Sequence, residues 1–264
     1  MHLFLSPHCD DVALSCGGRA SQLAAAGETV RVLTVMSGLA PDDDLSPFAR
    51  AHHSRWGRPG DRVAARQLRL AEDACALDAL GVQGDYLDWL DAIYRKEGGR
   101  RGAWLYTSND TLFAPLHPSE RPLAERLADD ILAYLGPERG GIVYAPLAVG
   151  SHVDHQLVRH ASLLLWQRGL AVRFYEELPY AEEAGRVAAA LSEPAGTLWV
   201  GEVYRLDERA LAARVAAVGC YVSQLVGLFG DATSYPQRVR AYAEKVGAGA
   251  GPAERLWRLE MKES

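Results

Sequence analysis

The chain of 264 residues has no long apolar run, no excess of positive charge and no basic cluster. Its formal net charge is −6, which argues against a protein that grips nucleic-acid or membrane phosphates. No apolar stretch approaches the ~18 residues of a membrane span. The first residues also lack the charged start, long apolar stretch and cleavage site of a secretory signal. We therefore expect a soluble, cytoplasmic protein with no membrane span and no nucleic-acid partner.

Cysteine is scarce, and its four positions contain no CxxC pair: Cys9, Cys16, Cys75 and Cys220. Because nothing indicates export, we expect all four thiols to be reduced. Cys16, Cys75 and Cys220 lie in apolar surroundings and are predicted to be small core residues. No spacing makes Cys9 a metal ligand, so a structural role is expected for it.

Strand-like and helical apolar patterns alternate along the first two-thirds of the chain. Strands are expected at His2–Ser6, Val30–Met36, Tyr86–Leu90, Gly141–Pro146, Ala171–Glu176 and Thr197–Leu206. Helices are expected at Val12–Ala26, Arg62–Leu80, Leu123–Leu135, Gln156–Gly169, Glu208–Val218 and Gln237–Val246. This alternation predicts an α/β fold with a parallel sheet flanked by helices on both faces. No linker-like stretch sets the last third apart, so we expect one domain over 1–264 with a C-terminal α/β elaboration.

Two loops at the carboxyl ends of predicted strands carry unusual residues. After the first strand comes the segment PHCDD, with His8, Asp10 and Asp11, and after the strand GIVYAP comes HVDH, with His152, Asp154 and His155. Ligands of open α/β sheets bind where such loops gather. Either loop alone is weak evidence for function, because His-x-x-Asp occurs on many protein surfaces and aspartates often cap helices. Two such loops, each at the end of a buried strand, favour a functional site.

Metal chemistry explains this set of residues. Catalytic zinc typically takes three protein ligands and leaves one position for water. His8, Asp11 and His155 supply two imidazoles and one carboxylate, while Asp10 is free to accept a proton from the water. His152 is then available to a developing oxyanion, and Asp154 is expected to hold its ring and keep it charged.

These motifs resemble the PIG-L or LmbE-like N-acetylglucosaminyl deacetylase family, which pairs a (P/A)HxDD loop with an HxDH loop in a Rossmann-like fold. The helix from Arg69 to Gly81 is similar to the family's RxxE…LG helix, and Tyr221, Ser223 and Gln224 match a late YxSQ signature. The resemblance implies a zinc ion, with Fe²⁺ as a possible alternative, on His8, Asp11 and His155. Asp10 is then the general base, His152 the oxyanion residue, and Asp154 its support.

The resemblance also implies substrate contacts. Arg69 falls where the family places a substrate-contacting arginine, although a solvated helix charge is the alternative. Asp91 falls where an acidic residue near the sugar is common, with an ordinary loop carboxylate as the alternative. The expected reaction removes an N-acyl group, most often acetyl, from a small amino-sugar conjugate. Two long segments, Gly38–Asp61 and Tyr94–Pro122, are expected to wall the cleft.

The sequence departs from the family pattern at several positions. Val153 stands where proline is usual, and Val12 where glutamate is common. Gly150 replaces a tyrosine that some members carry, so help from such a group would have to come from elsewhere in the chain.

Three other functions would use some of the same residues. A metal-dependent phosphoesterase would normally need a second set of metal ligands, and only His152 and Asp154 remain for one. A dinucleotide-binding protein would need GxGxxG after the first strand, where this chain has PHCDD. An inactive metal-binding scaffold is disfavoured by the intact Asp10. The acyl substrate and the oligomeric state, including a homo-oligomer, stay open.

Overall fold

The computed structural model describes all residues except 41–44, 100, 138–139, 193, 195–196 and 262–264. Its strands are β1 (His2–Ser6), β2 (Val30–Thr34), β3 (Gln83–Tyr86), β4 (Ile142–Pro146), β5 (Ala171–Tyr175), β6 (Thr197–Arg205) and β7 (Ala253–Met261). Its α-helices are α1 (Asp11–Ala25), α2 (Pro47–Arg55), α3 (Arg62–Leu80), α4 (Asn109–Leu112), α5 (Leu123–Leu135), α6 (Val153–Gln167), α7 (Arg186–Ala190), α8 (Glu208–Gly219), α9 (Val222–Phe229) and α10 (Tyr235–Gly247). Short 3₁₀ turns lie at Ala92–Tyr94, Pro118–Glu120 and Tyr180–Glu182.

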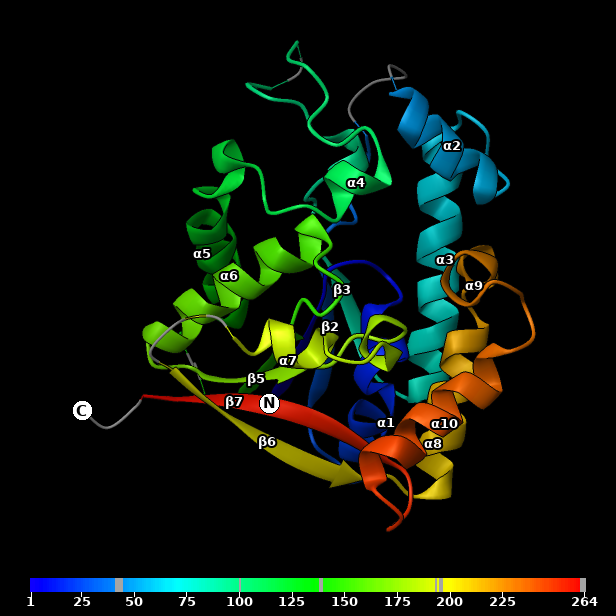
Figure 1. Cartoon of the computed structure of the whole chain (residues 1–264), viewed down its shortest axis with the longest axis vertical. Helices are drawn as coiled ribbons and strands as arrows, with labels where there is room; N and C mark the ends of the chain where they lie inside the picture. The colour runs from blue at the N-terminus through cyan, green and yellow to red at the C-terminus, as the bar shows by residue number, and fades with distance from the viewer. Residues whose placement is uncertain (41–44, 100, 138–139, 193, 195–196, 262–264) are drawn as a thin grey trace.

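The strands form one mixed sheet of seven in the order β3-β2-β1-β4-β5-β7-β6. The five strands β1 to β5 are parallel, and β7 is antiparallel to both β5 and β6. Figure 1 shows α5 and α6 on one side of the sheet and α1, α3 and α8 on the other. The predicted α/β class with helices on both faces is therefore confirmed, and the antiparallel β6–β7 pair belongs to the C-terminal elaboration.

Local sequence signals explain the best-predicted elements. The Asp61 carboxylate accepts a hydrogen bond from the Ala64 N–H at the start of α3, and Gly81 ends the helix in the left-handed conformation at φ 70°. The inner strands are apolar because both faces are covered: Leu3, Phe4 and Leu5 of β1 are at most 1% exposed.

The structure corrects three sequence expectations. The segment Gly38–Asp61 is not a continuous loop, because Pro47–Arg55 forms α2 behind an N-cap at Ser46; its residues 41–44 lie outside the described residues. The strand expected at Tyr86–Leu90 lies earlier, at Gln83–Tyr86. Strand β7 was not predicted.

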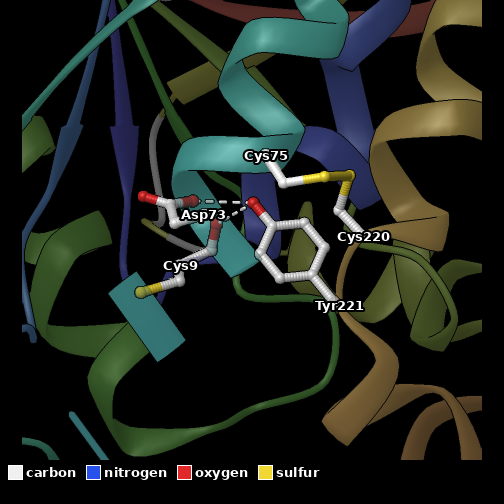
Figure 2. Close-up of a disulfide and its surroundings, with 5 residues drawn as sticks. All are labelled: Cys9, Asp73, Cys75, Cys220 and Tyr221. Atoms are coloured by element: carbon white, nitrogen blue, oxygen red, sulfur yellow. Dashed lines mark hydrogen bonds between the residues drawn. A yellow bond between two sulfur atoms is a disulfide. The ribbon is translucent and has the colours of Figure 1, made fainter. Parts of the chain in front are cut away.

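A disulfide joins Cys75 of α3 to Cys220 at the end of α8, so the expectation that both are reduced core thiols is wrong. Their Cα atoms are 5.8 Å apart, within the ordinary range for a disulfide. Figure 2 shows the bond beside Tyr221, whose hydroxyl lies 2.6 Å from both the Cys9 carbonyl oxygen and an Asp73 carboxylate oxygen. Cys9 and Cys16 are free and buried, as expected.

No single helix among the described residues is both long and apolar enough to cross a membrane. Helices α8 and α9 meet the length and composition test only as a pair, and they are bent by 99° at the break between them.

Candidate metal centre and active site

The two predicted loops meet at the switch point of the sheet. Strands β1 and β4 are neighbours, and their following connections run to opposite faces, which opens a crevice at their carboxyl ends. His8 and Asp10 lie in the loop after β1, and Asp11 begins α1. His152 caps the N-terminus of α6 and His155 lies in its first turn. The sheet topology thus brings together residues some 145 positions apart in the chain.

Two imidazoles face the two oxygens of one carboxylate. His8 Nδ1 lies 3.4 Å from Asp11 Oδ2, and His155 Nε2 lies 3.3 Å from Asp11 Oδ1. Ring nitrogens of His8, His152 and His155 also gather within 4.8 Å of one another. The predicted ligand set differs from this histidine group in one member, since it takes Asp11 in place of His152.

The far nitrogen of each imidazole is held by a second carboxylate. His8 Nε2 lies 3.0 Å from Asp154 Oδ2, and His155 Nδ1 lies 3.1 Å from Glu177 Oε1. Metal-binding histidines are typically oriented in this way, because a carboxylate on one nitrogen turns the other toward the ion. Imidazole and carboxylate donors with this support are typical of a site for a divalent cation.

The electrostatics of the cluster also favour a cation. Burial lowers the pKa of His8, but hydrogen bonds to Asp11 and Asp154 outweigh it, and the pKa rises well above the usual value. Burial likewise lowers the pKa of His155, while Asp11 and Glu177 raise it more strongly. Burial raises the pKa of Asp11, but the charges on His155 and His8 bring it down to about 2. A site that draws protons onto two buried rings also stabilises a metal ion in their place.

Asp154 lies closer to His8 than to His152, the ring that it is predicted to hold. Its Oδ2 is 3.0 Å from His8 Nε2 but 3.9 Å from His152 Nδ1, and its Oδ1 pairs with Arg95. Instead, the backbone N–H of Asp154 donates to His152 Nδ1 at 3.2 Å. Burial and the neighbouring positive charge of His8 lower the pKa of His152 well below its usual value, although the charge of Asp154 raises it.

A buried ion-pair chain behind Asp154 was not predicted. The Arg95 guanidinium lies between Asp154 and Glu120, with Nε 2.7 Å from Glu120 Oε1. Tyr106 donates to the other oxygen of Glu120 at 2.6 Å. Glu177 was missed too, although its place directly after β5 could have identified it, because the carboxyl ends of the parallel strands share one edge.

The Asp10 carboxylate is paired with an arginine of α3. Its Oδ1 lies 3.3 Å from Arg69 Nη2, and Arg69 Nη1 lies 3.6 Å from Glu72. With its amide oxygen turned toward Arg69 and Trp56, Gln224 accepts a hydrogen bond of 2.9 Å from the Arg69 guanidinium and another of 2.9 Å from the Trp56 indole. Ser223 donates to Glu72 at 2.7 Å through both its backbone and its hydroxyl. The late YxSQ residues therefore fix the helix that carries Arg69.

Asp91 lies close to the cluster without joining the predicted ligands. Its Oδ2 is 3.8 Å from His8 Nε2, and its Oδ1 accepts the N–H of Ile93. The group His8, Asp91 and Asp154 could also hold a cation, but it shares His8 with the first group. Among the described residues there is thus no second, independent set of ligands.

These groups open into a cavity of about 290 Å³. Its lining includes the predicted residues His8, Asp10, Asp11, Arg69, Asp91, His152 and His155. The segments Gly38–Asp61 and Tyr94–Pro122 both contribute walls, as expected, through residues such as Trp56 and Phe113.

A tyrosine from another loop, Tyr180, covers Gly150. A Cβ atom added at Gly150 would lie 2.5 Å from the Tyr180 ring, and Tyr180 lines the cavity. Burial and the charges of Asp11 and Asp10 raise the pKa of the Tyr180 hydroxyl, so it stays protonated. On either side of Gly150, Ala148 and Ser151 both have φ 60°, a strained backbone of the kind that clusters at functional sites.

One known protein family matches more than half of this chain. The model of the family described as GlcNAc-PI de-N-acetylase, PIG-L, matches residues 3–165, which include both metal loops. A 2'-N-acetylparomamine deacetylase of Niallia circulans is 32% identical over 240 residues, covering 87% of this chain and 82% of the relative. A protein of the same name from Streptomyces fradiae is 34% identical over 190 residues, covering 70% and 59%.

Solved structures of other deacetylases match this fold over the whole chain. The zinc-inhibited form of teicoplanin deacetylase Orf2 has a TM-score of 0.86 at 30% identity, covering 100% of this chain and 99% of the other. The A40926 pseudoaglycone deacetylase Dbv21 has a TM-score of 0.80 at 29% identity, covering 100% and 98%. With the family match, the sequence relatives and this geometry together, the chain belongs to the PIG-L family of de-N-acetylases and is an N-deacetylase.

Proposed function

We propose that His8, Asp11 and His155 hold a divalent metal ion, zinc in the first instance and Fe²⁺ as the alternative. The observation that carries this proposal is the placing of one Asp11 oxygen opposite each imidazole, at 3.4 and 3.3 Å. A metal bound there would polarise the acyl carbonyl and make a water acidic enough to attack near neutral pH.

Asp10 is the proposed general base. Its carboxylate lines the cavity and is tied to Arg69 rather than to the imidazoles, so it is free to take the proton of the attacking water. The same carboxyl group then returns the proton to the leaving amine. Arg69 orients the Asp10 carboxylate, and at the cavity wall it also contacts the substrate.

His152 is the proposed oxyanion residue, acting as a neutral donor. Because its Nδ1 accepts the N–H of Asp154, the remaining proton resides on Nε2. A neutral imidazole N–H stabilises the tetrahedral oxyanion by a hydrogen bond, an interaction whose loss usually costs roughly 10²–10³ in rate. Asp154 supports His8 instead, and Asp91 lies at the cavity wall where a sugar hydroxyl would sit.

The proposed substrate is a small amino-sugar conjugate. The relatives are named for paromamine and for teicoplanin. These names support an N-acylated amino sugar as the part of the substrate that is recognised. We further propose that residues 1–264 form a single domain, and that the protein is cytoplasmic and a homo-oligomer in solution.

The decisive experiment measures amine release from N-acetylglucosamine and its conjugates. Purified protein should contain about one metal ion per chain, lose activity with a chelator and regain it with added zinc. Asp10→Asn should keep its metal and lose most turnover, whereas the exposed Asp129→Asn should match the unaltered protein in both. Near-normal amine release by Asp10→Asn would contradict the assignment of the base.

A further inference from the structure

Tyr180 lines the cavity from the loop that follows β5. It begins the short 3₁₀ turn Tyr180–Glu182 and comes shortly after Glu177, the carboxylate that holds His155. The ring packs against Gly150, where an added Cβ atom would lie 2.5 Å from the Tyr180 Cγ atom. Because Cγ is the base of the ring, the end that carries the hydroxyl extends beyond the glycine.

The Tyr180 hydroxyl makes no hydrogen bond to any residue that the structure describes. It is also not one of the polar atoms that lack a partner and are sealed from solvent, so it opens to the cavity. Neighbouring tyrosines differ, since the Tyr94 hydroxyl lies 2.5 Å from His53 Nε2 and Tyr106 donates to Glu120 at 2.6 Å. Tyrosine hydroxyls inside proteins usually find a partner. The Tyr180 hydroxyl is therefore available to a substrate.

The charges around this hydroxyl indicate which part of the cavity it faces. Burial, and after it the negative charges of Asp11 and Asp10, raise the pKa of the Tyr180 hydroxyl. Electrostatic effects weaken with distance and solvent screens them, so this influence places the hydroxyl on the side of the metal cluster and the proposed base. The hydroxyl keeps its proton at neutral pH and can donate a hydrogen bond there.

Phe113 connects Tyr180 to the proposed oxyanion residue. The centroid of the Phe113 ring lies 6.0 Å from that of Tyr180, in a tilted arrangement, and 5.3 Å from that of His152, edge to face. Gly150, against which the Tyr180 ring packs, also belongs to the loop that leads to His152. These two contacts hold the tyrosine near the histidine, and both side chains line the same cavity.

Resting on the proposed function, we propose that the Tyr180 hydroxyl is a second donor to the acyl oxygen, beside His152. As water adds to the acyl carbon, the carbonyl oxygen takes up the negative charge, and Tyr180 donates a hydrogen bond to it while keeping its own proton. This bond is stronger in the tetrahedral state than in the planar amide, because its acceptor has become charged. The contribution of Tyr180 therefore falls on kcat rather than on KM.

The variant Tyr180→Phe tests this proposal on the zinc-loaded protein, since it removes one oxygen and keeps the ring against Gly150 and Phe113. Amine release from N-acetylglucosamine conjugates gives kcat and KM. Calorimetry gives the affinity for the methylphosphonamidate analogue of N-acetylglucosamine, whose tetrahedral, charged oxygens resemble the intermediate. Because loss of one oxyanion donor usually costs about 10²–10³ in kcat, we expect kcat to fall and analogue binding to weaken at least about tenfold, with KM within about twofold.

Tyr235→Phe is the matched control. Tyr235 also packs against a phenylalanine, Phe229, with ring centroids 6.3 Å apart, and its hydroxyl makes no hydrogen bond to a described residue. It does not line the cavity. This variant should match the unaltered protein in kcat, KM and analogue affinity. Melting temperature and metal content are measured for both variants, and both should stay at the values of the unaltered protein.

The outcomes separate this inference from the proposed function. If Tyr180→Phe keeps the kcat and the analogue affinity of the unaltered protein, the inference is overturned and deacetylation stands. A raised KM at unchanged kcat also overturns it, because the hydroxyl would then contact only the ground state. If the unaltered protein releases no amine from these conjugates, the proposed substrate is wrong. Analogue binding then decides on Tyr180 by itself: weaker binding by Tyr180→Phe supports the inference, and equal binding overturns it.

Discussion

The disulfide between Cys75 and Cys220 closes a very long loop, because the two cysteines have a sequence separation of 145. In the chain-entropy description, a loop of that length constrains the unfolded state by roughly 5 kcal/mol, and removing native disulfides typically costs about 2–4 kcal/mol. In a domain of this size each kcal/mol shifts the melting temperature by about 2–4 °C. We therefore expect the double variant Cys75→Ser, Cys220→Ser to melt about 5–15 °C below the oxidised protein. The variant should still fold, because Tyr221 and Ser223 keep their hydrogen bonds to the rest of the site.

Thermal denaturation followed by circular dichroism measures this loss. A reducing agent should lower the melting temperature of the unaltered protein toward that of the double variant, and it should not affect the variant itself. A thiol count on unfolded protein should rise from two to four on reduction, since Cys9 and Cys16 are already free. Four reactive thiols in the protein as purified, with identical melting of variant and parent, would refute the disulfide and restore the sequence-based expectation of reduced cysteines.

Three further substitutions probe the site and its supports. Asp154→Asn should weaken zinc binding about 10–100-fold in a competitive chelator titration, because His8 loses the carboxylate that orients it. An unchanged zinc affinity would mean that the Asp154–His8 hydrogen bond does not support metal binding. Burial raises the pKa of Asp73 from 3.8 to about 6, so the parent is favoured below pH 3.8 and loses that advantage as pH rises through 6. Asp73→Asn should therefore gain up to about 3 kcal/mol relative to the parent between pH 4 and pH 8 in urea unfolding, and a constant difference would contradict the shift. Gly150→Ala should displace the Tyr180 ring, which lies 2.5 Å from the added Cβ, and lower kcat about tenfold or more, whereas Ala184→Gly on the neighbouring surface should not.

The residues of the candidate site were largely predictable from the sequence. Each motif is short and local, and the order of the strands in the sheet brings the two motifs together. His8 with Asp11 and His152 with His155 each stand directly after a buried apolar strand, and parallel strands end at one edge. The order of the strands then decides which loops meet. Asp61 and Gly81 fixed the ends of α3 for the same local reason, since a cap acts within one turn.

The parts that could not be predicted depend on pairs of residues far apart in the chain. Arg95 and Glu120 are ordinary loop residues until the fold brings them behind Asp154. The disulfide likewise joins two positions whose surroundings are apolar, which a single sequence also associates with core thiols.

Strand β7 was not predicted from the sequence, because charged residues interrupt its apolar pattern. Arg255 lies 2.6 Å from Glu176, and Arg258 lies 3.0 Å from Glu202 of β6. These ion pairs with neighbouring strands accommodate side chains that the strand pattern alone disfavours. The same holds inside the domain at Glu254, which is buried because Arg214 lies 3.2 Å away.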